Sequence, residues 1–134
     1  MTVVRGAALV ACVLALCACG GSGHKAAAKV VARKSASGRH ASATASFKYR
    51  ILSDASVHVA AMPAQRVKGG WVVSCGTGLF TTSRDSADFT RQTPFDMDIR
   101  TFAAASNETC ELVAVATLAR SGRVTVALRG RQSD

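Results

Sequence analysis

The 134-residue sequence lacks the short motifs that mark many catalytic and metal-binding proteins. It contains no CxxC pair, and no histidine lies near Cys75 or Cys110, so the ligand spacing of a zinc site is missing. No GxSxG nucleophile motif occurs. The segment 76–78 is a lone GxG with no third glycine after it, which indicates a turn rather than a phosphate-binding loop. We therefore expect no cofactor, no metal and no catalytic residue.

The sequence also lacks an apolar run long enough to span a bilayer comfortably. The apolar stretch from Gly6 to Ala18 is shorter than the roughly 20 residues that a membrane-spanning helix needs. It follows the positive charge of Arg5, and a short basic start before an apolar segment of this length is typical of a signal peptide. We expect residues 1–18 to be absent from the mature protein.

The end of this segment, Leu16-Cys17-Ala18-Cys19, resembles the lipobox of bacterial lipoproteins. That motif has a leucine three residues before an invariant cysteine and a small residue just before it. Cys17 departs from the pattern, because Ala, Ser, Thr or Val is more usual there. The resemblance implies a diacylglycerol thioether on Cys19, cleavage before it, and anchoring to the extracytoplasmic face of the cell membrane. Two acyl chains anchor a protein stably, and the resemblance implies no activity beyond this processing.

The five cysteines divide into three groups. Cys12 and Cys17 leave with the leader, and Cys19 takes the lipid. Cys75 and Cys110 remain as an even pair in an exported domain, where the compartment permits a disulfide. We expect these two to be bridged, which stabilises the fold by roughly 3–4 kcal/mol in the chain-entropy model. Two free thiols or a metal pair are the alternatives.

Acidic residues are missing from residues 20–46, a segment that supplies more than half of the net charge of +9. Its composition, rich in Ala, Ser and Gly without aromatics, predicts a flexible linker over 19–46. Basic residues without aromatics behind an export leader argue against nucleic acid as a partner. We expect anionic lipid or wall polymer instead, attracted by about 1 kcal/mol per cation near a membrane. The cations are Lys25, Lys29, Arg33, Lys34 and Arg39.

From residue 47 onward, apolar and polar residues alternate with period two, which predicts β-strands. The nearly apolar segment 112–118 predicts a central strand buried on both faces, and Phe95 to Ala103 predicts another strand. The polar segment 84–92 predicts a loop or a single helical turn, and Arg120–Arg123 predicts a tight hairpin. About seven short strands over 47–134 favour an all-β fold, a small immunoglobulin-like β-sandwich.

Few side chains of the predicted domain suggest chemistry. Asp96 and Asp98 share one strand face, which suits acid–base work, a bound cation or a solvated surface. His58 is the sole histidine after residue 46, and a hydrolase would need it in a pocket beside a carboxylate and a nucleophile. Trp71 is either a core residue or an exposed aromatic at a binding surface.

The sequence therefore predicts an anchored binding or accessory module of the cell envelope, with an envelope protein as its unidentified partner. Such a module needs an apolar surface patch or an exposed sheet edge. A small exported hydrolase is one alternative. A structural envelope protein that binds anionic polymers through the basic linker is another.

Overall fold

The computed structural model describes residues 28–77 and 79–133, and every regular element in this part is a β-strand. The predicted signal peptide, the lipobox, Cys19 and Lys25 lie outside the described residues. Eight strands follow one another: β1 (Lys29–Arg39), β2 (Ser42–Tyr49), β3 (Ile51–Met62), β4 (Arg66–Thr77), β5 (Phe80–Gln92), β6 (Phe95–Asp98), β7 (Thr109–Leu118) and β8 (Ser121–Ser133).

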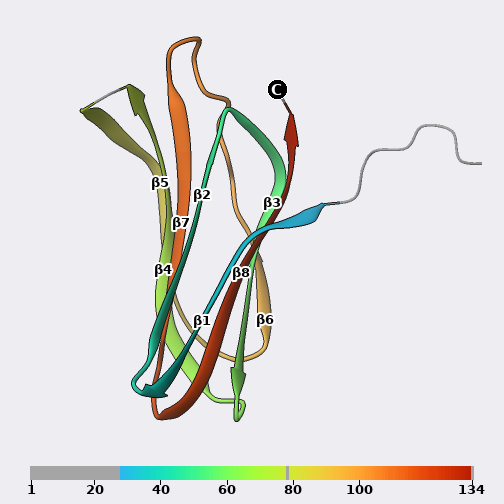
Figure 1. Cartoon of the computed structure of the whole chain (residues 1–134), viewed down its shortest axis with the longest axis vertical. Coiled ribbons are helices and arrows are strands. Elements are labelled where there is room, and N and C mark those ends of the chain that lie inside the picture. Colours follow the sequence, from blue (N-terminus) through green and yellow to red (C-terminus); the bar gives the residue numbers. More distant parts are fainter. Residues whose placement is uncertain (1–27, 78, 134) are drawn as a thin grey trace, which may run out of the picture.

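The strands form two four-stranded antiparallel sheets packed face to face (Figure 1). Sheet A has the order β1-β8-β3-β6, and sheet B has the order β2-β7-β4-β5. Apolar side chains from both inner faces form one core. The predicted all-β sandwich is confirmed, with eight strands rather than about seven.

The pairing of the strands is that of one long hairpin rolled into two layers. β1 pairs with β8, β2 with β7, β3 with β6 and β4 with β5, while the β3–β8 and β4–β7 pairs complete the sheets. This is the arrangement of an eight-stranded jelly roll. It differs from the immunoglobulin order, in which the ABED and CFG strands form the two sheets.

Within the described chain, β4 and β5 are the single pair of consecutive strands that are also neighbours in a sheet. The other connections cross between the layers. The prediction of a tight hairpin at Arg120–Arg123 is therefore wrong: β8 already begins at Ser121, and the two-residue connection before it joins sheet B to sheet A. Gly122 has φ 154° there, and a Cβ on it would lie 2.8 Å from the carbonyl oxygen of Met62.

The prediction of a flexible linker is wrong for the residues from Lys29 onward. β1 forms a ladder with β8, and β2 forms one with β7. Small side chains take the inner positions of these strands: Ala43 and Ala45 are buried, and Ala32 and Ala36 pack partly buried against the core. β1 and β2 are therefore only weakly hydrophobic, as a spacer is. Pairing with the apolar strands β7 and β8 supplies the stabilisation that their own side chains lack.

The polar segment 84–92 also forms a strand and not a loop or a helical turn. It belongs to β5, an edge strand of sheet B. Phe89 is its one buried residue, and the other positions are exposed or half-buried. Charged side chains on an edge strand hinder pairing with other chains, so this polarity is compatible with a strand. The strand predicted to continue to Ala103 instead ends at Asp98.

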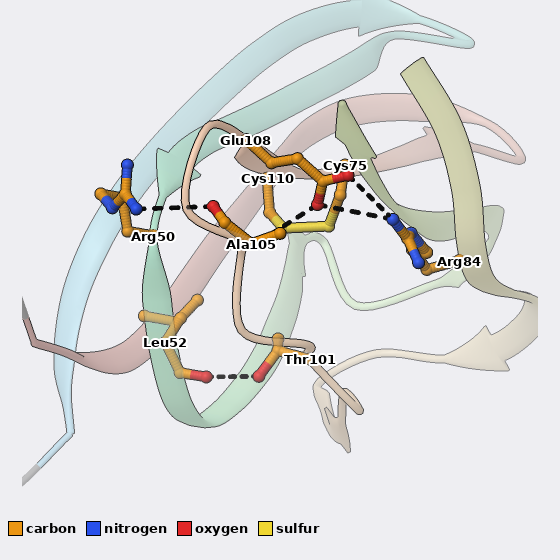
Figure 2. Close-up of a disulfide and its surroundings, with 8 residues drawn as sticks. All are labelled: Arg50, Leu52, Cys75, Arg84, Thr101, Ala105, Glu108 and Cys110. Atoms are coloured by element: carbon orange, nitrogen blue, oxygen red, sulfur yellow. Dashed lines mark hydrogen bonds and ion pairs between the residues drawn. A yellow bond between two sulfur atoms is a disulfide. The ribbon is translucent and has the colours of Figure 1, made fainter. Parts of the chain in front are cut away.

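The predicted disulfide between Cys75 and Cys110 is present and links neighbouring strands of sheet B (Figure 2). The two residues lie directly opposite each other in the β4–β7 ladder, with their Cα atoms 4.0 Å apart. Both are buried. The bond therefore fixes the register of the two central strands of this sheet.

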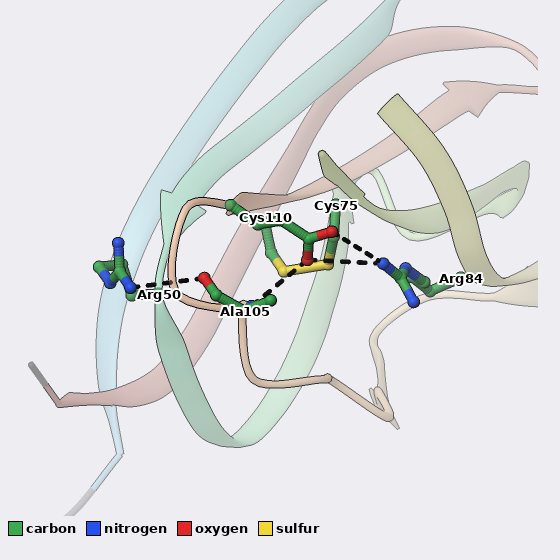
Figure 3. Close-up of polar contacts among 6 residues, drawn as sticks. Arg50, Cys75, Arg84, Ala105 and Cys110 are labelled. Atoms are coloured by element: carbon green, nitrogen blue, oxygen red, sulfur yellow. Dashed lines mark hydrogen bonds and ion pairs between the residues drawn. A yellow bond between two sulfur atoms is a disulfide. The ribbon is translucent and has the colours of Figure 1, made fainter. Parts of the chain in front are cut away.

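Polar contacts fasten the connection between β6 and β7 beside the disulfide (Figure 3). The carboxylate of Glu108 accepts hydrogen bonds from the backbone N–H of Ala105 and from the guanidinium of Arg84, both at 3.3 Å. Arg50 donates to the carbonyl oxygens of Ala105 and Ser106. This loop is thereby held against the β2–β3 connection and β5 at one end of the sandwich.

At the other end of the sandwich, a buried glutamine joins three connections. The side chain of Gln65 accepts a hydrogen bond from the backbone N–H of Arg120 at 2.8 Å and donates one to the carbonyl oxygen of Ser121 at 3.1 Å. Its backbone N–H donates to the hydroxyl of Thr93. Gln65 is 2% exposed, so these bonds compensate for the loss of water around its amide.

Candidate functional site

The two large amphipathic aromatics, Trp71 and Tyr49, are buried in the core of the sandwich. Trp71 is 8% exposed and belongs to the core, so it is not an exposed binding aromatic. Its Nε1 atom has no hydrogen-bond partner among the described residues, and neither has the hydroxyl of Tyr49. Burial raises the pKa of Tyr49 above 10.0, and the nearby backbone of Phe102 opposes the rise.

A wide depression of the described surface lies on the outer face of sheet B. Alternate residues of three adjacent strands line it, and these point away from the core: Val113, Val115 and Thr117 of β7, Lys68, Gly70 and Val72 of β4, and Ser86, Asp88 and Thr90 of β5. We call this depression the hollow. Its volume is about 1110 Å³, slightly above the range of roughly 300–1,000 Å³ for small-molecule sites.

The floor of the hollow is apolar. Val72 lies opposite Val113, and Gly70 lies opposite Val115 in the β4–β7 ladder. The three valines are half-buried, although the sequence pattern of β7 predicted burial on both faces. The prediction of a central strand is confirmed, but no second layer covers the outer face of this strand in the described chain.

Glycine is required at the centre of the floor because neighbouring strands approach it closely. A Cβ on Gly70 would lie 2.6 Å from the carbonyl oxygen of Ala87, and one on Gly69 would lie 1.9 Å from that of Val115. Both distances are shorter than nonbonded contacts allow. The absence of a side chain at Gly70 also leaves the floor open between the valines.

The rim of the hollow is polar and carries both signs of charge. Arg66 and Lys68 lie on β4, and Asp88 lies on the edge strand β5. Neither Lys68 nor Asp88 forms an ion pair with another described residue. His40, in the turn between β1 and β2, also lines the hollow.

A second, more polar depression of about 480 Å³ lies further along the same face. Lys48, Ser74 and Glu111 line it, and their positions in the ladders directly follow the row of Val72 and Val113. The two depressions therefore lie end to end on the outer face of β7 and β4. Together they provide an apolar section followed by a charged one.

The tip of the β4–β5 hairpin presents two large apolar side chains to solvent. Leu79 is 96% exposed and Phe80 is 82% exposed. The hairpin projects from one end of the sandwich (Figure 1). An apolar surface feature of this kind is one that a binding module needs.

The carboxylate pair predicted on β6 is divided between two environments. Asp96 Oδ1 lies 2.9 Å from His58 Nδ1 on the outer face of sheet A, whereas Asp98 lies opposite Ser56 in the ladder. A hydrolase needs this type of histidine–carboxylate contact, but it also needs a pocket and an activated nucleophile. Neither depression includes His58, and no described hydroxyl forms a hydrogen bond with its ring.

The described residues offer no metal site. No group of three or more His, Cys, Asp or Glu side chains in 28–77 and 79–133 is placed to hold an ion. Asp85, on β5, instead accepts a hydrogen bond from the backbone N–H of Ser86. No helix in this part of the chain could span a membrane.

Comparison of the chain with protein-family models, with curated proteins and with solved structures finds no match. The sequence did not predict the hollow, although its signals are visible in retrospect. They are valines at alternate positions of a central strand and a Gly69-Gly70 pair on its neighbour.

Proposed function

We propose that the protein is a membrane-anchored extracytoplasmic lipoprotein whose jelly-roll domain binds a ligand in the hollow on sheet B. The observation that carries the binding role is the apolar floor of Val72, Val113 and Val115, which no other described element covers. Half-exposed valines beneath a polar rim match the general anatomy of a ligand site, in which apolar surface gives affinity and a few polar groups give orientation.

The lining supports an amphipathic ligand in this proposal. An aliphatic portion contacts the valines, and polar groups meet the hydroxyls and charges of the rim. Lys68 and Asp88 flank the floor from neighbouring strands, so they favour a ligand that carries opposite charges or a polarised group such as an amide. A binding role is preferred to a catalytic one because the hollow contains no paired nucleophile and base among its described lining residues.

The anchor in this proposal rests on the lipobox resemblance at Leu16–Cys19 and is tested separately from ligand binding. Inhibition of the lipoprotein signal peptidase with a globomycin-type compound is expected to accumulate the precursor. The Cys19→Ala chain is expected to lose lipid labelling and membrane retention. An unchanged mature size under inhibition would contradict the anchor.

The binding role is tested by blocking the hollow with a bulky side chain. Val115→Trp places an indole on the floor, whereas Ser35→Trp adds the same group at an exposed position of β1 on sheet A, away from the hollow. Both proteins are immobilised and used to capture molecules from solubilised cell envelopes. We expect Ser35→Trp to retain the captured ligand and Val115→Trp to lose it. Equal capture by both variants would contradict binding in the hollow.

A further inference from the structure

Four of the cations predicted to lie in a linker form part of a two-stranded ribbon. β1 and β8 pair along ten positions from Lys29 to Arg39. The two strands together carry seven cationic side chains and no acidic one. We call this pair of strands the cationic ribbon. Its cations are Lys29, Arg33, Lys34 and Arg39 on β1, and Arg123, Arg129 and Arg131 on β8.

Little of this charge is neutralised within the described fold. Arg131 forms an ion pair with Asp54 of β3. The other six cations have no ion-pair partner among residues 28–77 and 79–133. Like charges held this close repel one another, so an external polyanion is the natural complement of the ribbon.

The ladder register shows which of these cations face outward. Val124, Val126 and Leu128 of β8 are buried, so Arg123 and Arg129 alternate with them and point away from the core. Arg33 lies opposite Ala127 and shares this outer face. Three exposed arginines therefore project from the outer face of sheet A on two adjacent strands.

The position of the ribbon indicates which anion it meets. β1 begins ten residues after Cys19, so a fully extended chain places the ribbon within about 35 Å of the lipidated residue. The start of β1 lies on the side of the sandwich opposite the β4–β5 hairpin (Figure 1). The anionic surface nearest to the ribbon is then the membrane that holds the anchor.

We propose that the cationic ribbon docks the domain onto the anionic lipid surface to which Cys19 is attached. This inference rests on the lipid anchor of the proposed function. Because the hollow lies on the outer face of sheet B, docking through sheet A turns the hollow away from the membrane. Asp96 and Asp98 lie on β6, the edge strand of sheet A farthest from β1. Because an anionic surface repels these carboxylates, the β1 edge lies closer to the lipid.

The test uses the chain from Gly20 to Asp134, which retains every strand of the sandwich but carries no lipid. Sedimentation with phosphatidylglycerol–phosphatidylcholine vesicles measures its partition coefficient against vesicles of phosphatidylcholine alone. The triple variant Arg33→Gln, Arg123→Gln and Arg129→Gln is expected to bind anionic vesicles about a hundredfold less, at roughly fivefold per cation. Binding of the unsubstituted chain is expected to weaken as salt rises.

The matched control removes the same charge from sheet B through Lys48→Gln, Arg66→Gln and Lys68→Gln, three exposed positions on β2 and β4. It is expected to change partition less than threefold. Equal losses in both variants would show a net-charge effect and overturn the ribbon as the docking surface. Binding to soluble poly(glycerol phosphate) but not to vesicles would overturn the membrane as its partner. Neither result bears on the proposed function, which is tested separately by ligand capture in the hollow and by lipid labelling of Cys19.

Discussion

Removal of the Cys75–Cys110 bond is expected to bring the domain close to unfolding. The bond spans 35 residues, and closing a loop of that length lowers the entropy of the unfolded chain by an amount worth about 4 kcal/mol at 25 °C. Both cysteines are buried, so alanines at these positions also lose packing, by about 1 kcal/mol. Small domains have total stabilities of roughly 5–15 kcal/mol, so the loss is a large fraction of the whole.

The assay is denaturant unfolding of the oxidised chain, the reduced chain and the Cys75→Ala, Cys110→Ala variant. We expect the reduced chain to lose about 4 kcal/mol and the variant slightly more, with melting temperatures lower by about 15–30 °C. The reduced chain serves as the control, because it keeps the sulfur atoms in the core. A loss below about 1 kcal/mol on reduction would refute the loop-entropy reasoning.

Three further variants test the packing of the sandwich. Tyr49→Phe is expected to change stability at pH 7 by less than about 1 kcal/mol, because the buried hydroxyl lacks a described partner. Because burial raises the folded-state pKa of Tyr49 above its unfolded value of 10.0, native stability falls as the pH rises above 10, and Tyr49→Phe is expected to remove this part of the loss in alkaline urea titrations. Gln65→Leu leaves a backbone N–H and a carbonyl unsatisfied, so its unfolding free energy is expected to fall by about 2–4 kcal/mol; a loss below 1 kcal/mol would contradict the role of the buried amide. Leu79→Ser with Phe80→Ser is expected to change stability by less than about 0.5 kcal/mol, and a larger loss in thermal melts would show that the hairpin tip packs against the body.

The sequence allowed the layered all-β architecture and the disulfide to be predicted, because both depend on local signals. Period-two alternation marks a strand with one buried face wherever large apolar residues occupy that face. The pairing of Cys75 with Cys110 followed from counting the cysteines left after the predicted export processing. Neither inference needed the strand order.

The first and fifth strands could not be predicted by the same means, because their stabilisation comes from their neighbours. β1 packs only partly buried small residues such as Ala32 and Ala36 against the core, which gives a weak periodic signal, and β5 buries Phe89 alone. The jelly-roll order is likewise non-local, since β1 pairs with the last strand of the chain. Such pairings leave no trace at fixed spacing in a single sequence.

The hollow could not be predicted because it depends on which face of β7 remains uncovered. Val113 and Val115 look like core residues in the sequence, and the lack of any described element over sheet B makes them surface residues. The role inferred for the cationic residues of β1 also depends on the fold. As part of a linker they would be a mobile charge, whereas on paired strands they are a surface with a fixed direction.

Ligand binding on the outer face of sheet B is tested most directly by mapping amide chemical shifts. The ¹⁵N-labelled domain is titrated with the molecule that Ser35→Trp captures and Val115→Trp does not. We predict shifts concentrated at Gly70, Val72, Val113 and Val115, with sheet A unaffected. Shifts confined to sheet A or to the hairpin tip, with the hollow unchanged, would contradict the assignment of the hollow as the binding site.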